Sequence, residues 1–409
     1  MKKCLLNIIA CVCFILPAAA QTASMPANDN ALSQKYPFVR SVFNRILNTG
    51  GLDSFYKKLY QLKTTGTGTI SVVHIGDSHI QADFLSDVVR DGLQDFFGDA
   101  GRGLVFPYQL AQSNAPDDIS SSSNTFWQFN RIAHPEIDIS YGVSGYGIRS
   151  TNSGADINLS LRPSVSNSSF TRLKFFLDTS SSNSWILHAG ITETPYLLKK
   201  EQGDSLAYQQ VNLDQPATNF SISSLPSGNT KEFYGVSLEN SNAGVIYHTI
   251  GVNGARYEQY NIASLFWEQL PALKADLYIV SLGTNEAQMA GFVDPVFTKE
   301  LDIFMQKLKQ TSPGASVLIT TAPDSYKGRR FNTVLRDVNA SLTNYCNKNY
   351  IPLWDLYRIT NGYGSANSWA RRGLMSRDRV HFTSEGYRLQ GNLLLMALAK
   401  GYNTYTSSY

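Results

Sequence analysis

Short β-branched runs that alternate with helical patterns decide the fold class of this chain. The first run covers 69–75, ends at Gly76 and precedes a predicted helix over 82–97. After residue 250 the alternation resumes, with strands at 276–282, 316–321 and 351–353 and helices at 257–270, 295–309, 331–347 and 384–399. Buried runs that alternate with helices are typical of a doubly wound parallel sheet, so we predict the α/β class.

The region before the first strand contains two amphipathic helical patterns, over 39–47 and 55–62, separated by a pair of glycines. Apolar residues recur there at helical spacing, which predicts two short amphipathic helices.

Between 155 and 250 the pattern changes to short strand-like runs separated by turn residues, without a long helix. The runs are 157–161, 173–177, 184–189, 220–222, 234–238 and 245–250. This spacing predicts an all-β sandwich or jelly roll. We therefore expect an α/β domain built from 21–107 and 248–409, interrupted by a β-rich insertion at 108–247.

Residues 1–20 have the features of a secretory signal peptide. Two lysines precede an apolar stretch over 5–16, and three alanines at 18–20 provide a cleavage site. The stretch is too short for a membrane span, and no later window is apolar for about 20 residues. We expect a protein that is secreted across the inner membrane into the periplasm or the medium. Cys11 faintly suggests lipid anchoring, but the better cleavage site lies downstream.

Cleavage of the leader would leave Cys346 as the single cysteine, so no disulfide within the chain is expected. Cys346 continues a helical apolar pattern, which predicts a small buried side chain rather than a nucleophile.

The charge of the chain argues against a nucleic-acid partner. Thirty-five Lys and Arg stand against 32 Asp and Glu, charged residues make up only 16%, and no long basic run occurs. The six histidines form no helical His pair, and no dinucleotide or phosphate loop opens a helix. We therefore expect no cofactor and no metal ion.

Polar clusters follow the predicted strands, where ligands bind in an open α/β sheet. They are Gly76-Asp77-Ser78-His79, Gly251-Val252-Asn253-Gly254, Gly283-Thr284-Asn285-Glu286 and, before the last helix, Asp378-Arg379-Val380-His381. Together they offer a hydroxyl, an imidazole, a carboxylate and amide donors. Acyl transfer through a serine needs this set of groups.

Each group has a role in such chemistry. Ser78 is the candidate nucleophile, His381 the base that takes its proton, and Asp378 the carboxylate that orients the imidazole. The N–H groups of Ser78 and Gly254 and the side-chain amide of Asn285 are candidate oxyanion donors.

These residues also have structural interpretations. Ser78 and Asn285 could cap helices, and Gly254 could serve a left-handed turn. Asp378 could instead pair with a neighbouring arginine, and His381 could be an ordinary surface histidine. His79 could shape the substrate pocket or pack against the sheet.

Aromatic residues of the insertion could stack on sugar rings or form the core of the sandwich. They are Trp127, Phe175, Phe176, Trp185 and Tyr196. The core interpretation is the better one for most of them, since nothing in their spacing indicates exposure.

The four clusters, in this order, resemble the four sequence blocks of the SGNH, or GDSL, hydrolases. The resemblance covers roughly 36–106 and 245–400. The leader, the GDSHIQAD stretch and the insertion are similar to peptidoglycan O-acetylesterases, which carry a carbohydrate-binding-like module within the esterase domain. The family implies Ser78, Asp378 and His381 as triad and Gly254 and Asn285 as oxyanion donors.

Two positions depart from the common family pattern. His79 stands where Leu is common, and Glu286 where Asp is commoner. Neither is a triad position, so these departures blur the subfamily more than the chemistry.

The sequence thus favours an exported serine esterase that removes O-acetyl groups from a cell-envelope glycan, with peptidoglycan as the leading candidate. An O-acetyltransferase, an esterase for another polysaccharide and a non-catalytic glycan-binding protein remain alternatives. The glycan, the hydroxyl that is deacetylated and the oligomeric state stay open.

Overall fold

The computed structural model describes residues 24–27, 30–135, 137–162, 169–178, 184–190, 194–199, 207–225 and 230–408. The predicted leader, with its three cysteines, lies outside the described residues. Across the described ranges, no helix combines the length and the apolar character needed to cross a membrane.

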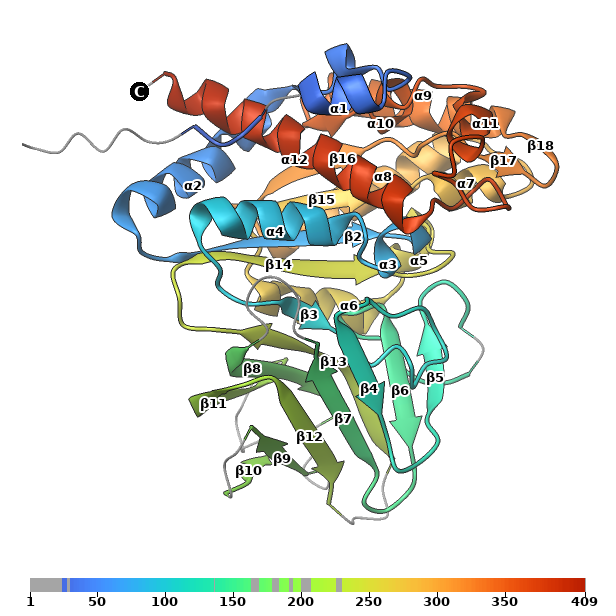
Figure 1. Ribbon diagram of the computed structural model, residues 1–409. Coiled ribbons are helices and arrows are strands. Elements are labelled where there is room, and N and C mark those ends of the chain that lie inside the picture. The colour runs from blue at the N-terminus through green and yellow to red at the C-terminus, as the bar shows by residue number, and fades with distance from the viewer. Residues whose placement is uncertain are drawn as a thin grey trace, which may run out of the picture.

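A mostly parallel sheet forms the centre of the α/β part (Figure 1). Within the described residues its strand order is β1-β19-β16-β15-β2-β14. The parallel strands are β2 (Thr69–Gly76), β14 (Gly244–Gly251), β15 (Leu277–Ser281), β16 (Ser316–Thr320) and β19 (Leu353–Trp354). Edge strand β1 (Ile46–Leu47) pairs antiparallel with β19.

Helices cover both faces of this sheet, as the side-chain alternation along its strands requires. Val72 and Ile279 pack on one face, with α2 (Asp53–Thr65), α4 (Ser86–Phe97) and α12 (Ser384–Thr406). Val73 and Val280 point to the other face, with α5 (Tyr257–Asn261), α6 (Ser264–Gln269), α8 (Asp294–Thr311) and α9 (Thr333–Lys348). The predicted doubly wound α/β class is confirmed.

Short elements complete the α/β part. They are α1 (Asn30–Lys35), η1 (Ser41–Phe43), η2 (Thr49–Leu52), α3 (Ser78–Gln81), η3 (Leu270–Leu273), α7 (Thr284–Gln288), β17 (Tyr326–Lys327), β18 (Arg330–Phe331), α10 (Leu356–Ile359) and α11 (Ser365–Ala370).

Two antiparallel sheets form the β-rich part, in the lower half of Figure 1. One sheet has the order β10-β9-β12-β7-β4, and the other has the order β11-β8-β13-β6-β5 with β3 on β13. The strands are β3 (Gly103–Val105), β4 (Ile119–Ser122), β5 (Gln128–Arg131), β6 (Tyr146–Ser150), β7 (Asp156–Leu161), β8 (Phe170–Leu177), β9 (Trp185–Ala189), β10 (Tyr196–Leu198), β11 (Gln209–Ala217), β12 (Asn219–Ser224) and β13 (Lys231–Glu239). The rings of Phe175 and Phe220, one from each sheet, meet edge to face at 5.3 Å, as in a sandwich core.

The aromatic residues of the insertion are mainly core. Trp127, Phe175, Phe176 and Trp185 are at most 1% exposed, so stacking on sugars is wrong for these four. Tyr196 is half-buried. Cys346 is fully buried, as predicted, and burial raises the pKa of its thiol to about 12.

Three local predictions differ from the structure. The predicted helix over 39–47 is instead η1 and strand β1, because Asn44 bonds to Trp354 and to the carbonyl of Leu393. The run 245–250, grouped by spacing with the insertion, belongs to β14 and pairs with β2 along its length. The predicted insertion boundary at 247/248 therefore falls inside a strand of the parallel sheet.

The helix predicted over 82–97 begins only at Ser86. Asp83 has φ 64°, so the chain turns out of helical geometry between α3 and α4. The Asp83 carboxylate accepts hydrogen bonds from Ser86 Oγ at 2.5 Å and Thr249 Oγ1 at 2.9 Å, which hold this conformation.

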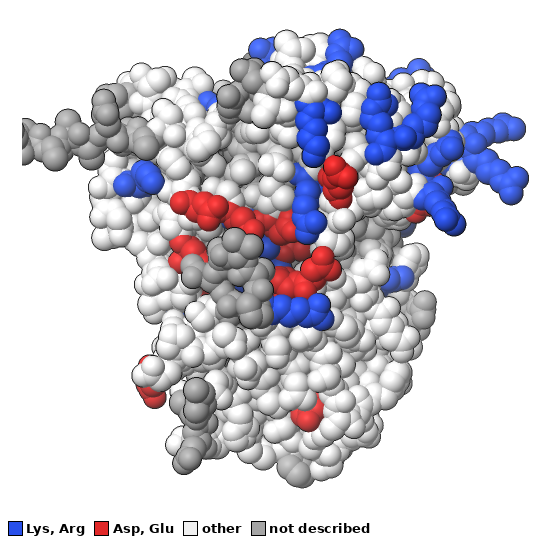
Figure 2. All heavy atoms as spheres, viewed as in Figure 1, with Lys and Arg blue, Asp and Glu red and all other residues white. Residues whose placement is uncertain are grey.

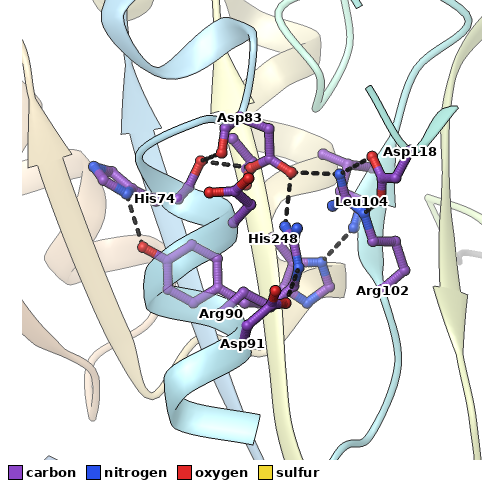
Figure 3. Close-up of polar contacts among 12 residues, drawn as sticks. His74, Asp83, Arg90, Asp91, Arg102, Leu104, Asp118 and His248 are labelled. Atoms are coloured by element: carbon purple, nitrogen blue, oxygen red, sulfur yellow. Dashed lines mark hydrogen bonds and ion pairs between the residues drawn. The ribbon is translucent and has the colours of Figure 1, made fainter. Parts of the chain in front are cut away.

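Asp83 also belongs to a buried ion-pair network between the α/β part and the sandwich (Figure 3). It pairs with Arg90 of α4 and with Arg102, and Arg102 pairs in turn with Asp118, which precedes β4. Burial alone would raise the pKa of Asp83, but the two guanidinium groups outweigh it and lower the pKa. A second link runs from the Leu104 N–H to His248 Nδ1 at 3.0 Å.

Candidate active site

Ser78 is presented at the carboxyl end of β2, as the first residue of α3. The N-cap of this short helix is Asp77, whose Oδ1 accepts a hydrogen bond from the His79 N–H at 2.9 Å. Asp77 thus caps α3 and supports the turn, and the cap interpretation of Ser78 is wrong. The Ser78 hydroxyl is left available for a side-chain partner.

That partner is His381, although 303 positions separate the two residues. Ser78 Oγ lies 2.9 Å from His381 Nε2, and His381 Nδ1 lies 2.7 Å from Asp378 Oδ2. Asp378 Oδ1 accepts the backbone N–H groups of Val380 and His381 at 2.9 and 3.0 Å, which fixes the carboxylate in the loop before α12. The structure therefore brings the three predicted residues into one hydrogen-bonded chain.

The electrostatics of Asp378 suit an orienting carboxylate. Burial would raise its pKa, but hydrogen bonds from the His381 ring and from two backbone N–H groups lower the pKa below its ordinary value. An ionised carboxylate beside Nδ1 favours the tautomer with a proton on Nδ1, which leaves Nε2 free to accept the serine proton.

The site is open to solvent. The side chains of His381 and Asp378 are 41% and 49% exposed. An acyl group on the outside of a large molecule can therefore approach Ser78 without first entering a deep pocket.

Two predicted oxyanion donors follow strands of the parallel sheet: Gly254 lies in the loop after β14, and Asn285 lies in α7, after β15. Gly254 has φ +86°, and a Cβ placed there would lie 3.0 Å from His134 Nε2. Asn285 lies inside α7, where Gly283 is the N-cap, so the cap interpretation of Asn285 is wrong. Its Nδ2 donates to Asp77 Oδ2 at 3.3 Å and to the Ala255 carbonyl at 3.0 Å.

Two buried carboxyl groups stand behind the nucleophile. Burial raises the pKa of Asp77 and of Glu286 to about 7 in each case. Glu286 Oε1 accepts the Tyr257 N–H at 2.9 Å, so this residue joins the third sequence block to α5.

His79 packs behind the candidate base. It is only 7% exposed, its Nδ1 lies 3.0 Å from the Tyr387 hydroxyl, and its ring centre lies 5.6 Å from that of His381. Burial lowers its pKa to about 3, so it is neutral at physiological pH. These contacts favour the packing interpretation over a direct contact with substrate.

Sequence reasoning missed the role of Gln81. Its Oε1 accepts the Tyr146 hydroxyl and the Asn253 N–H, both at 2.9 Å, while its Nε2 donates to Ser113 Oγ at 2.7 Å. Gln81 thus joins the loop of Gly254 to the β-rich part. Its place in the GDSHIQAD stretch was the available signal, but its partners lie at positions that no local pattern connects.

The sequence predicts no metal site, and this stays a prediction. In the part of the chain that the structure describes, no three His, Cys, Asp or Glu side chains gather in a way that could hold one.

Comparisons with known proteins agree with this geometry. The model of the GDSL-like lipase/acylhydrolase family matches residues 203–389, a range that contains Gly254, Asn285, Asp378 and His381. No curated protein has a matching sequence.

A solved structure of a peptidoglycan O-acetylesterase is similar to this chain, with a TM-score of 0.73 and 22% identity over 86% of this chain and 96% of that one. A lipase/acylhydrolase from Enterococcus faecalis matches 38% of this chain and 77% of its own, with 19% identity and a TM-score of 0.31. An acetyl xylan esterase matches 37% of this chain and 78% of its own, with 18% identity and a TM-score of 0.30.

The chain therefore has the SGNH hydrolase fold, and the family match over residues 203–389 supports an acylhydrolase.

Proposed function

We propose that this chain is an exported serine esterase that removes O-acetyl groups from a cell-envelope glycan, with peptidoglycan as its substrate. The observation that carries the proposal is the hydrogen-bonded chain from Ser78 through His381 to Asp378. A hydroxyl, an imidazole and a carboxylate in this order are the arrangement that activates serine for attack on an ester.

In the first half of the reaction, Ser78 Oγ attacks the acetyl carbonyl while His381 Nε2 takes its proton. Asp378 stabilises the imidazolium that forms. His381 then gives the proton to the sugar oxygen as the ester bond breaks, which leaves an acetyl group on Ser78.

Negative charge on the carbonyl oxygen is stabilised by the N–H groups of Ser78 and Gly254 and by the Asn285 amide. In the resting site, one N–H of the Asn285 amide donates to Asp77 Oδ2 at 3.3 Å. When substrate binds, the carbonyl oxygen replaces Asp77 as the acceptor of this long hydrogen bond. Each such donor typically contributes about 3–4 kcal/mol in the transition state.

In the second half, water replaces the sugar. His381 takes a proton from water, the hydroxide oxygen bonds to the acetyl carbon, and Ser78 leaves with the proton returned by His381. Acetate is the product, and no step needs a cofactor.

Three observations support a glycan of the cell envelope as the substrate. The triad is open, which suits an acetyl group on a polymer. The protein with the similar fold over 96% of its length is named a peptidoglycan O-acetylesterase. The sequence of residues 1–20 favours export to the compartment of that polymer.

Acetate release from O-acetylated peptidoglycan and hydrolysis of 4-nitrophenyl acetate test the proposal. We expect Ser78→Ala to lower kcat on both substrates by at least about a thousandfold. Ser264→Ala, at an exposed position at the start of α6, is the matched control and should retain wild-type rates.

Full activity of Ser78→Ala would remove the nucleophile assignment. Transfer of the acetyl group to an added glycan hydroxyl, in preference to water, would assign the transferase alternative instead.

A further inference from the structure

Basic residues gather beside the candidate triad. The β17–β18 hairpin, α11 and the loop over 371–382 contain seven of them: Lys327, Arg329, Arg330, Arg371, Arg372, Arg377 and Arg379. Figure 2 shows Lys and Arg concentrated over the region of α11 and this hairpin, with few acidic side chains among them.

Direct contacts hold these elements together. The Tyr326 N–H donates to the Arg379 carbonyl at 2.9 Å, and the Tyr326 hydroxyl donates to Asn367 Oδ1 at 3.0 Å. The Arg379 guanidinium bonds to the same Asn367 oxygen at 2.8 Å and lies 4.7 Å from the centre of the Tyr326 ring. The hairpin, α11 and the triad loop therefore form one continuous surface.

Four of the arginines are exposed and available to a ligand: Arg329, Arg330, Arg371 and Arg377. Among the described residues, none of the four has an ion pair with a carboxylate within 4.0 Å. We call these four residues the arginine rim.

The remaining charges near the rim are already engaged. Lys327 donates to the carbonyls of Ala287 and Met289, and Arg372 donates to Ser368. Asp378 is bonded to His381, and among the described residues it forms no ion pair within 4.0 Å with an arginine of the rim.

Four unpaired guanidinium groups on one surface indicate an anionic partner, because Arg binds carboxylates through two parallel hydrogen bonds. The rim reaches the triad itself, since Arg377 is the immediate neighbour of Asp378. A ligand that contacts the rim therefore continues into the reaction site. This position favours an anionic substrate over a partner that binds elsewhere.

We propose that the arginine rim binds the stem-peptide carboxylates of peptidoglycan and so holds the acetylated sugar over Ser78. This inference rests on the proposed function and adds a recognition surface to it. Exposed ion pairs are individually weak and are screened by salt, so the rim acts through several contacts and depends on ionic strength.

The test uses the full chain with Arg329, Arg330 and Arg371 changed together to Gln. Arg377 stays unchanged, so that the loop of Asp378 is undisturbed. Arg45→Gln is the control, because Arg45 is exposed before β1 and lies outside the rim. The substrates are O-acetylated peptidoglycan, the same glycan strands after enzymatic removal of the stem peptides, and neutral 4-nitrophenyl acetate.

We expect the triple variant to raise KM for intact peptidoglycan by about tenfold while kcat is retained, as three weak ion pairs together predict. Its kinetics on peptide-free strands and on 4-nitrophenyl acetate should equal those of the wild type. Added NaCl should raise the wild-type KM only for the intact polymer.

The results separate failure of the rim from failure of the proposed function. If wild type acts on peptidoglycan and the triple variant has the same KM, the rim inference is wrong. An equal loss on peptide-free strands would mean that the arginines contact the sugar chain or the lactyl carboxylates that peptide removal leaves on it, and would also overturn the inference. If wild type hydrolyses 4-nitrophenyl acetate but releases no acetate from peptidoglycan, the proposed substrate fails and the inference fails with it.

Discussion

Asp77 offers a test of how the site is built, because its carboxyl group is buried directly behind Ser78. It is 1% exposed, and burial raises its pKa from 3.8 to about 7 in the folded protein. The folded state therefore keeps this proton to a higher pH than the unfolded state does. The stabilising effect of the proton is fully present below pH 3.8 and is lost as the pH rises towards 7.

The magnitude follows from the two pKa values. A difference of about three pH units corresponds to about 4 kcal/mol of unfolding free energy, at about 1.4 kcal/mol per unit. The side chain of Asn at position 77 cannot ionise, so the Asp77→Asn variant does not lose this stability as the pH rises. Its stability relative to the wild type should rise by up to about 4 kcal/mol between pH 4 and pH 8.

Urea unfolding of both proteins at several pH values between 4 and 8 measures this difference. Asn at position 77 places an amide beside the Asn285 amide, which lowers stability by an amount that does not depend on pH. The test is therefore how the difference in unfolding free energy between variant and wild type changes with pH. The size of that difference at any single pH does not test the argument. Asp337→Asn, on the exposed side of α9, reports the effect of removing a surface carboxylate under the same conditions. A flat difference for Asp77→Asn would refute the argument that this carboxyl is held protonated by burial.

Two further substitutions test the ion-pair network between the α/β part and the sandwich, and the loop that contains Gly254. Arg102→Met should lower the free energy of unfolding by about 3–5 kcal/mol in urea titrations, because it leaves buried Asp83 without one of its two cationic partners; a loss under 1 kcal/mol, on the scale of an exposed pair, would contradict this. Gly254→Ala should lower kcat on 4-nitrophenyl acetate by about a hundredfold, because an L-residue resists φ +86° and its Cβ would approach the ring of His134. Gly66→Ala, at φ +64° with open space around the Cβ, also places an L-residue in the left-handed region but away from the site, so an equal fall in kcat there would refute the local explanation.

The parts of the site that sequence could predict are those with a local signature. Ser78, Gly254 and Asn285 each follow a strand, and parallel strands deliver their carboxyl ends to one edge of the sheet. Asp378 and His381 could be predicted as a pair because a three-residue offset lets one carboxylate bond both the ring and the backbone of the histidine.

The sequence-based predictions that were wrong concern segments whose structure depends on contacts with distant parts of the chain. The helical pattern over 39–47 is real, but Asn44 gains two buried hydrogen bonds, to Trp354 and Leu393, in a non-helical conformation. The apolar run 245–250 has the composition of a strand in either kind of sheet, and its pairing with β2 decides between them. Composition within a short window cannot distinguish these outcomes, since the free energy lies in partners elsewhere in the chain.

The contacts of Gln81 explain why the β-rich part belongs to the site and is more than an appendage. Gln81 lies three residues after Ser78, and its side chain bonds both Asn253, next to Gly254, and Tyr146 of β6. The nucleophile turn, the oxyanion loop and the sandwich therefore share one buried amide, whose acceptor and donor groups are both used. Because a buried amide without its partners is costly, the three segments stabilise one arrangement together. The sandwich thus helps to hold the Gly254 N–H in position, whether or not its outer surface ever contacts a sugar.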